Sequence, residues 1–402
     1  MPAKTARYAL VVLTLVNLFN YLDRYVVSAL VESLKHSSLH LSDVQLGSLM
    51  TGFIVVYMLS SPVFGSLGDR GKRPRLVAAG VAVWSLATGL GGFARNFASL
   101  LTARSAVGIG EAAYGTIAPA LLADAFPRER RGRVFAIFFC AIPIGSAAGY
   151  VIGGLVDQHF GWRAAFFIVG FPGLLLALLV SRIVDPPRGR EDADDSPAAR
   201  AGLAGYRDLL RNGPYRRAVA GYAAYTFALG GLAFWTPAFL ERVRGVPRAQ
   251  ATVLFGAIVV ATGFVGTFAG GWLGDYFLRR SRQAYLWVSG AATLAAAPVA
   301  LVAFTSTSKP VYVSAVVIAE ILVFMSTGPV NSAIVNAVAP DRRARAVALS
   351  ILAIHLFGDV PSPPLIGAIS DATSLSRAFL ALPAVFALAG AIWLHAAWKG
   401  GS

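Results

Sequence analysis

Apolar runs long enough to cross a membrane recur along the whole chain, and this feature limits the fold more than any other. An α-helix needs about 20 apolar residues to cross the hydrocarbon core of a bilayer. Only 14% of the residues are charged and 56% are hydrophobic, whereas soluble domains are about 25% charged. We therefore predict an all-α membrane protein with twelve transmembrane helices. The predicted spans are residues 8–32, 43–67, 75–94, 97–126, 132–156, 163–184, 216–241, 249–278, 284–305, 310–338, 345–370 and 376–398.

Basic residues indicate the orientation of these helices. The net charge is +15, and most Lys and Arg residues fall in short clusters such as 70–75 and 128–133, on the same side of the membrane as the N-terminus. The positive-inside rule then predicts that both termini are cytoplasmic, in a multi-pass protein of the inner (plasma) membrane. Because the basic residues follow this topology, the charge does not indicate a nucleic-acid-binding surface.

A charged, proline-rich segment divides the chain almost equally. Residues 185–201 read DPPRGREDADDSPAARA and lack apolar periodicity, which is typical of a linker. We predict an N-terminal six-helix bundle at 1–185, a cytoplasmic linker at 186–212 and a C-terminal six-helix bundle at 213–402.

The two halves share sequence patterns in the same order. The pattern Gly-x-Leu-Gly-Asp occurs at 65–69 and again at 271–275, and a Pro followed by a basic cluster occurs at 127–133 and 340–345. Such repetition indicates duplication. The predicted architecture is therefore two pseudo-symmetric bundles.

The first of these patterns resembles a known loop signature. Residues 65–73, GSLGDRGKR, resemble the signature of the major facilitator superfamily between helices two and three, and 271–282 resembles its degenerate second copy. The resemblance implies a cytoplasmic gate in which small residues allow close helix approach and Asp69 pairs with a basic residue. The gate residues it implies are Gly65, Asp69, Arg70, Arg73, Gly271 and Asp275.

Three further motifs resemble one branch of that superfamily. They are NYLDRY at 20–25, VGIGEAAY at 107–114 and HLFGDVPSP at 355–363, and all three are similar to the spinster family. Animal spinster proteins export sphingosine-1-phosphate or lysophospholipids, and this chain looks like a bacterial member. The resemblance implies a secondary active transporter that works by alternating access on an amphipathic anionic substrate such as a lysophospholipid or sphingolipid.

Other functions remain open on the same scaffold. One is a proton-coupled transporter of small organic acids or drugs, although Tyr150 stands where the helix-five motif of drug antiporters has a proline. The neighbouring Gly145, Gly149 and Gly153 are then explained by close helix packing. A non-transporting membrane receptor or a lipid scramblase is a third class. No motif indicates an enzyme or a cofactor, the histidines lack metal-ligand spacing, and we expect a monomer.

Ionisable residues inside the predicted spans indicate a functional site. Each costs about 2.5–3.5 kcal/mol on insertion scales. Counting depth along helices one and four places Asp23 near Arg104, with Glu111 two turns below. We predict that Asp23 and Glu111 couple protons, because a low dielectric favours the protonated carboxyl group and a nearby guanidinium favours the carboxylate. A structural ion pair between the two helices is the alternative.

Substrate is predicted to act on this pair. A phosphate or carboxylate on the cargo can draw Arg104 away from Asp23 by bidentate pairing, which lets Asp23 take a proton. Asn20 and Tyr114 join Arg104 as candidate substrate or switch residues. Arg24 is a further candidate, although it lies about 100° round the helix from Asp23, which favours a role in gating or lipid contact.

The C-terminal half offers a weaker candidate site. Its members are Glu320, His355, Asp359 and Ser362. Asp359 lies among Gly and Pro residues, so it can equally cap a kinked backbone, and His355 is more typical of a hydrogen-bonded helix contact. The predicted partners of the whole protein are the bilayer, protons and a small-molecule or lysolipid substrate.

Overall fold

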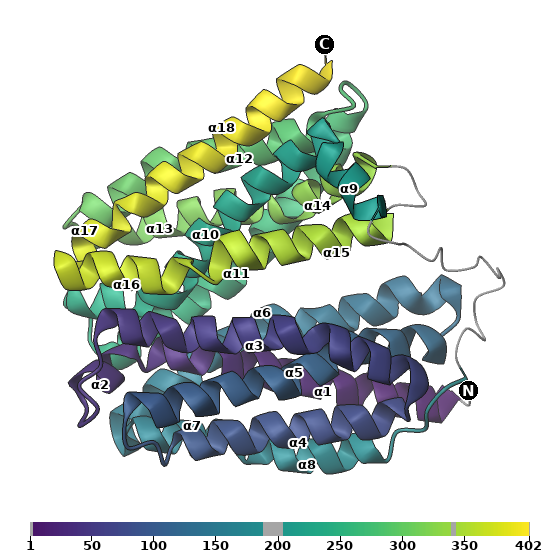
Figure 1. The fold of residues 1–402 in the computed structure, drawn as a ribbon. Helices are drawn as coiled ribbons and strands as arrows, with labels where there is room; N and C mark the ends of the chain where they lie inside the picture. Colours follow the sequence, from purple (N-terminus) through teal and green to yellow (C-terminus); the bar gives the residue numbers. More distant parts are fainter. Residues whose placement is uncertain (1–2, 188–203, 339–342, 402) are drawn as a thin grey trace. The chain divides into compact units, whose positions relative to one another are not determined.

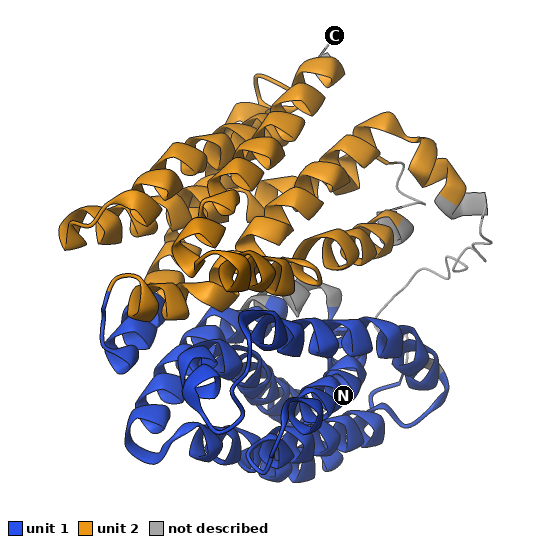
Figure 2. Ribbon diagram, turned by 60° about the vertical axis from the view of Figure 1, so that its left-hand side comes forward, with its two compact units in different colours: residues 1–197, 245–256 blue, residues 198–244, 257–402 orange. Residues whose placement is uncertain are grey.

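The computed structural model describes residues 3–187, 204–338 and 343–401, and this part of the chain contains helices and no strand. It forms two compact units, residues 1–197 with 245–256 and residues 198–244 with 257–402 (Figure 2). Most of the predicted linker, residues 188–203, lies outside the described residues.

The first unit contains the N-terminal helices (Figure 1). They are α1 (Ala3–Ala29), α2 (Val31–His36), α3 (Asp43–Arg70), α4 (Arg73–Gly91), α5 (Phe97–Ala125), α6 (Arg128–Phe160), α7 (Trp162–Gly170) and α8 (Pro172–Ser181), with the first turns of α11 (Arg248–Leu278). Capping boxes fix two of the starts: Ser42 with Gln45 before α3, and Asn96 with Ser99 before α5. Each satisfies backbone N–H groups that a helix start leaves free.

The second unit contains the remainder of α11 and the C-terminal helices. They are α9 (Ala204–Arg211), α10 (Gly213–Arg242), α12 (Ala284–Thr305), α13 (Lys309–Phe324), α14 (Thr327–Asn336), α15 (Arg343–Ile354), the π-helix η2 (His355–Asp359), α16 (Ser362–Ala372), α17 (Leu375–Phe379) and α18 (Ala381–Gly401).

Eleven stretches of helix in the described part of the chain are long and apolar enough to cross a membrane. The helix α4, with 19 residues and Arg73 and Arg75 in its first turn, is not among them. Large apolar side chains such as Phe268 (82% exposed) and Leu175 (68% exposed) lie on the surface. A surface of this kind is suited to lipid, so the chain is a multi-pass membrane protein.

Several predicted spans are interrupted in the structure. The span predicted at 163–184 divides into α7 and α8 at Pro172, whose ring removes a backbone N–H. The span predicted at 310–338 divides into α13 and α14, and the one at 345–370 contains η2. Hydrophobicity reports only the length of an apolar segment, so it does not locate such breaks.

Glycines bring α6 against α1, which is the packing role predicted for them. A Cβ atom added at Gly149 would lie 2.6 Å from the carbonyl oxygen of Leu22, and one at Gly153 would lie 2.9 Å from the Cβ of Ala29. Both helices therefore approach backbone to backbone. This contact fixes the rotation of α1, which carries Asp23 and Arg24.

Candidate functional site

Asp23 and Arg104 form a buried ion pair between α1 and α5. Arg104 Nη1 lies 2.9 Å from Asp23 Oδ1, and both side chains are at most 2% exposed. The second oxygen of Asp23 accepts a 2.5 Å hydrogen bond from the hydroxyl of Thr88 on α4. The predicted meeting of Asp23 and Arg104 is thus present, and Thr88 adds a third helix to it.

Arg24 forms a second ion pair between the same two helices. Its Nη2 lies 2.7 Å from Glu111 Oε2, and Glu111 is fully buried. The interpretation of Arg24 as a lipid contact is therefore wrong, whereas its alternative assignment to the charge switch agrees with this geometry. Two consecutive residues of α1 both reach α5, because each pair contains a long arginine side chain.

Aromatic rings surround the Arg24 guanidinium. Its Cζ lies 4.8 Å from the ring centre of Tyr21, 5.0 Å from that of Phe53 and 5.7 Å from that of Tyr57. Cation–π attraction helps to hold a desolvated cation. The Arg24 side chain is nevertheless 20% exposed, which makes it the most accessible of the four charged groups.

The two pairs leave hydrogen-bonding capacity unused. Within the described part of the chain, no partner is present for the buried Nε atoms of Arg24 and Arg104, for Glu111 Oε1 or for Asn20 Nδ2. Such orphaned groups are uncommon in buried positions. The Glu111 oxygen can therefore accept a proton or a hydrogen bond, and the three nitrogens can donate to a water molecule or to the polar group of a ligand.

Tyr114 occupies a different position. It is 2% exposed, its hydroxyl donates to the carbonyl oxygen of Leu13 at 2.9 Å, and its ring packs edge-on against Trp84. These contacts hold α1, α4 and α5 together beside the charged pairs.

Arg73, a residue of the predicted gate motif, joins three segments of the first unit. Its Nη1 lies 2.5 Å from Asp124 Oδ2 at the end of α5, its Nε lies 2.9 Å from Asp185 Oδ1, and its Nη2 donates to the carbonyl oxygen of Pro186 at 2.6 Å. Arg73 is 4% exposed. Asp185 was assigned to the end of the predicted N-terminal bundle, and this contact ties it to the start of α4.

The two copies of the loop signature share their packing. No atom lies within 4 Å of a Cβ added at Gly65 or Gly271, whereas Cβ atoms at Gly68 and Gly274 would lie 2.9 Å from Ile117 and 2.8 Å from Tyr285. The second glycine of each copy therefore provides the close approach expected of the first. In the second copy Asp275 accepts a 2.8 Å hydrogen bond from the Tyr285 hydroxyl.

Arg70 and Asp69 are the remaining gate residues of the first copy. Arg70 is exposed at the end of α3. The predicted pairing of Asp69 falls on a side chain outside the described residues.

The C-terminal candidates form two separate groups. His355 Nδ1 lies 3.0 Å from Asp359 Oδ1 across the π-helix η2, a helix type that is frequent at functional sites. Ser362 is fully buried and donates to the carbonyl oxygen of Phe227 at 2.5 Å. His355 and Asp359 thus contact each other, while Ser362 anchors α16 to α10.

Glu320 lies apart from these residues in a narrow apolar pocket of about 10 Å³. It is 3% exposed and neither carboxylate oxygen has a hydrogen-bond partner in the described part of the chain. Thr262 lies beside it, but the Thr262 hydroxyl donates to the carbonyl oxygen of Ile258 at 2.7 Å. Leu232, Phe304 and Phe386 are among the pocket walls.

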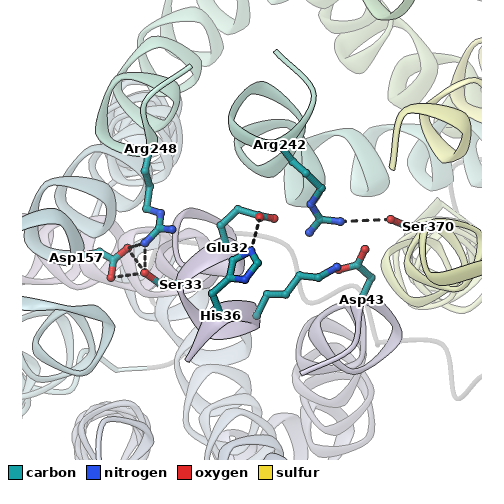
Figure 3. A network of polar contacts seen from close by, with 9 residues as sticks. Glu32, Ser33, His36, Asp43, Asp157, Arg242, Arg248 and Ser370 are labelled. Atoms are coloured by element: carbon teal, nitrogen blue, oxygen red, sulfur yellow. Dashed lines mark hydrogen bonds and ion pairs between the residues drawn. The ribbon is translucent and has the colours of Figure 1, made fainter. Parts of the chain in front are cut away.

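A further polar network ties the first turn of α11 to the first unit (Figure 3). Arg248 Nη1 lies 3.1 Å from Asp157 Oδ2 and also contacts the hydroxyl of Ser33, which itself donates to Asp157. The Asp157 side chain is 1% exposed. This network explains why residues 245–256 group with the N-terminal helices.

Three features of the site were not found from the sequence. They are the hydrogen bond of Thr88 to Asp23, the pairing of Arg24 with Glu111, and the Arg73 network. Thr88 is an unremarkable hydroxyl in an apolar run, so no local signal identifies it. The aromatic pair Phe53 and Tyr57, spaced i and i+4 on α3, is a signal that could have pointed to a cation beside that face.

Comparison with known proteins places these features in a family. The model of the Major Facilitator Superfamily matches residues 13–358. Protein spinster of Drosophila melanogaster is 32% identical over 376 residues, which cover 91% of this chain and 62% of that protein. Protein spinster homolog 3 of Danio rerio is 36% identical over 387 residues, which cover 91% of this chain and 77% of that protein.

Solved structures agree with the sequence relatives. A bacterial homolog to the human lysosomal transporter Spinster, crystallised in an inward-facing and unoccupied conformation, superposes with a TM-score of 0.90 at 25% identity, over 99% of this chain and 98% of that one. The nucleoside transporter NupG shares the fold, with a TM-score of 0.76 at 13% identity over 96% and 98% of the two chains. The chain is a transporter and not an enzyme, and it belongs to the spinster branch of the Major Facilitator Superfamily.

Proposed function

We propose that this protein is a proton-coupled secondary transporter that moves an amphipathic anion by alternating access. The observation that supports it best is the pair of buried ion pairs, Asp23 with Arg104 and Arg24 with Glu111. Charged groups within membrane spans are functional by default. Here two carboxylates and two guanidiniums share one helix interface.

Arg24 is the proposed substrate contact. Its guanidinium is 20% exposed, whereas that of Arg104 is 2% exposed, so an arriving anion reaches Arg24 first. A phosphate or carboxylate that pairs with Arg24 draws this arginine away from Glu111. Glu111 then loses its counterion. Glu111 then lies in a low-dielectric site without a cation and takes a proton.

The second pair extends the switch. Arg104 and Asp23 neutralise each other, and Thr88 donates a hydrogen bond to the second oxygen of Asp23. A change in the helix contact between α1 and α5 separates Arg104 from Asp23. Substrate occupancy and protonation thereby bias the same conformational equilibrium.

The substrate class follows from the family and from the chemistry of Arg24. The rings of Tyr21, Phe53 and Tyr57 give the guanidinium an apolar surrounding, which suits a lipid with one anionic group such as a lysophospholipid or a sphingolipid phosphate. A small organic acid or drug is the alternative substrate, and a receptor or scramblase is the alternative of another class. In this proposal α4 also crosses the membrane, which brings the number of spans to twelve. Both termini are cytoplasmic, and the protein is a monomer in the inner membrane.

Flux measured in proteoliposomes tests the proposal. The purified chain is reconstituted with a pH-sensitive dye inside, and lysophospholipids or organic acids are added with and without a pH gradient. We expect lysophospholipid-driven proton movement and substrate accumulation that follows the gradient. Lipid movement unaffected by any gradient would instead identify a scramblase, and binding without movement a receptor.

A thermal-shift screen of the same compounds at two pH values identifies the substrate class. Lysolipids are expected to raise the melting temperature in wild type and to lose this effect in Arg24→Ala. Stabilisation by small organic acids alone would favour the alternative substrate.

A further inference from the structure

A groove runs between the first turns of α10 and the last turns of α18, within the second unit. Its volume is about 640 Å³. The two helices are joined by Trp393 of α18, whose Nε1 donates to the carbonyl oxygen of Ala218 on α10 at 3.0 Å. Both helices are of membrane-spanning length, and the lining residues lie where α10 begins and α18 ends. We call it the α10–α18 groove.

One end of the groove is cationic. Arg216, Arg217 and His395 line it, and no acidic residue of the described part of the chain does. Among the same residues neither arginine side chain forms a hydrogen bond or an ion pair, and the Nε atom of Arg217 is buried without a partner. Two adjacent guanidiniums without an acidic partner among the described residues form a strongly positive site.

The other end is apolar. Ala220 lies one turn further along α10, and Ala391 and Ile392 lie one turn before His395 on α18. The distance along α10 from Gly213 to Ala220 is about 10 Å at 1.5 Å per residue. The groove therefore changes from cationic to apolar as it runs from the helix ends toward the middle of the helices.

An aromatic side chain marks the level of the membrane surface here. Trp398 is 66% exposed, and its ring centre lies 6.4 Å from that of His395. Exposed tryptophans are enriched at the boundary between headgroups and hydrocarbon. The arginines of the groove thus lie at the depth of lipid phosphates.

We propose that the α10–α18 groove binds the headgroup of an anionic phospholipid from the bilayer. The guanidiniums of Arg216 and Arg217 pair with the phosphate, a geometry that favours Arg over Lys, and an acyl chain lies along Ala220, Ala391 and Ile392. The apolar wall distinguishes this occupant from a soluble phosphate, which would leave that wall in water. This site is separate from the ion pairs of the first unit.

Native mass spectrometry of the purified chain tests the assignment. Phosphatidylglycerol and phosphatidylcholine with identical acyl chains are titrated in parallel. We expect selective binding of phosphatidylglycerol, weakened about 30-fold in Arg216→Ala/Arg217→Ala, which is the effect of removing two interfacial arginines. Equal retention of the two lipids by wild type, or unchanged phosphatidylglycerol binding in the variant, would overturn the proposal.

Three controls distinguish lipid binding in the groove from general charge effects, from misfolding of the variant and from binding of soluble phosphate. Arg182→Ala/Arg280→Ala removes two exposed arginines elsewhere and is expected to keep the binding. Ala391→Trp fills the groove while keeping its charges and is expected to lose it, which keeps the proposal testable if the double arginine variant does not fold. Inorganic phosphate is added as a competitor: displacement of the lipid at low millimolar concentration would assign the groove to a soluble phosphate and contradict the lipid.

Discussion

The guanidinium of Arg24 lies 2.7 Å from the carboxylate of Glu111, and of these two side chains only Arg24 is exposed, by 20% against 0%. The preceding residue, Asp23, pairs with Arg104 on the same helix α5. An anion that reaches this interface therefore meets a cation whose counterion is a fully buried carboxylate. In the proposed mechanism, this relationship links substrate binding to protonation.

Removal of the Arg24 side chain is expected to destabilise the protein in a pH-dependent way. Arg24→Ala leaves Glu111 as an uncompensated buried charge, which costs about 3–5 kcal/mol. The cost is present where Glu111 is ionised and disappears as the pH falls and Glu111 binds a proton. Melting temperatures from pH 5 to 8 should thus show the largest deficit of the variant at high pH.

The matched control for this loss is the double variant Arg24→Ala/Glu111→Gln. Because it removes both charges, its melting temperature should be close to that of wild type and its deficit should not vary with pH. A deficit equal to that of Arg24→Ala would show that the ion pair is not the cause.

The hydroxyl of Thr88 is expected to stabilise the contact between α1 and α4. Thr88→Val removes the 2.5 Å hydrogen bond to Asp23 Oδ2 while keeping the side-chain volume, and hydrogen bonds to charged groups contribute about 1.5–3 kcal/mol. The melting temperature should therefore fall, because a buried carboxylate oxygen is left without its donor. Thr88→Ser, which keeps the hydroxyl, should retain most of the wild-type melting temperature, and an unchanged melting temperature in Thr88→Val would contradict this role of the hydrogen bond.

The sequence identified one of the two ion pairs because depth along a helix is a reliable guide. Counting from the helix ends brought Asp23 to the level of Arg104, and the structure has them at 2.9 Å. The pairing of Arg24 with Glu111 was not predicted, because a helical wheel gives the direction of a side chain from the axis but not the reach of a long one. Arg24 turns back to α5 past the rings of Tyr21 and Phe53.

Arg73 is expected to be important for the stability of the first unit. Arg73→Ala leaves Asp124, whose side chain is 12% exposed, without its guanidinium, and loss of one partner of a buried pair costs about 3–5 kcal/mol. Arg73→Lys retains a charge but cannot reach Asp124, Asp185 and Pro186 together. Its loss of stability should therefore lie between those of wild type and Arg73→Ala. Thermal unfolding of both variants measures this order, and equal melting temperatures for wild type and Arg73→Ala would refute it.

Two glycines in the first unit should respond oppositely to alanine. The Cβ of Gly149→Ala would lie 2.6 Å from the Leu22 carbonyl oxygen, which forces α6 away from α1, whereas that of Gly65→Ala meets no atom within 4 Å. Overpacking costs about 1–3 kcal/mol, while Gly to Ala in a free helical position gains up to about 1 kcal/mol. Melting temperatures should fall for Gly149→Ala and should not fall for Gly65→Ala.

The C-terminal half was less predictable for a physical reason. His355 and Asp359 pair within the π-helix η2, and no hydrophobic period signals a local change of helix type. The position of Glu320 could not be assigned a face from sequence, because α13 is apolar on all sides of it. Duplication predicted the shared loop signature but not the different chemistry of the two halves.

Substrate-driven proton flux in proteoliposomes, compared for wild type, Asp23→Asn and Glu111→Gln, tests the central claim most directly. Orientation in the vesicles and melting temperature of each variant are measured alongside, so that loss of folding is recognised. We expect the wild-type flux to depend on pH and both variants to lose that dependence while still binding substrate. Wild-type pH dependence in both variants would contradict proton coupling by these carboxylates.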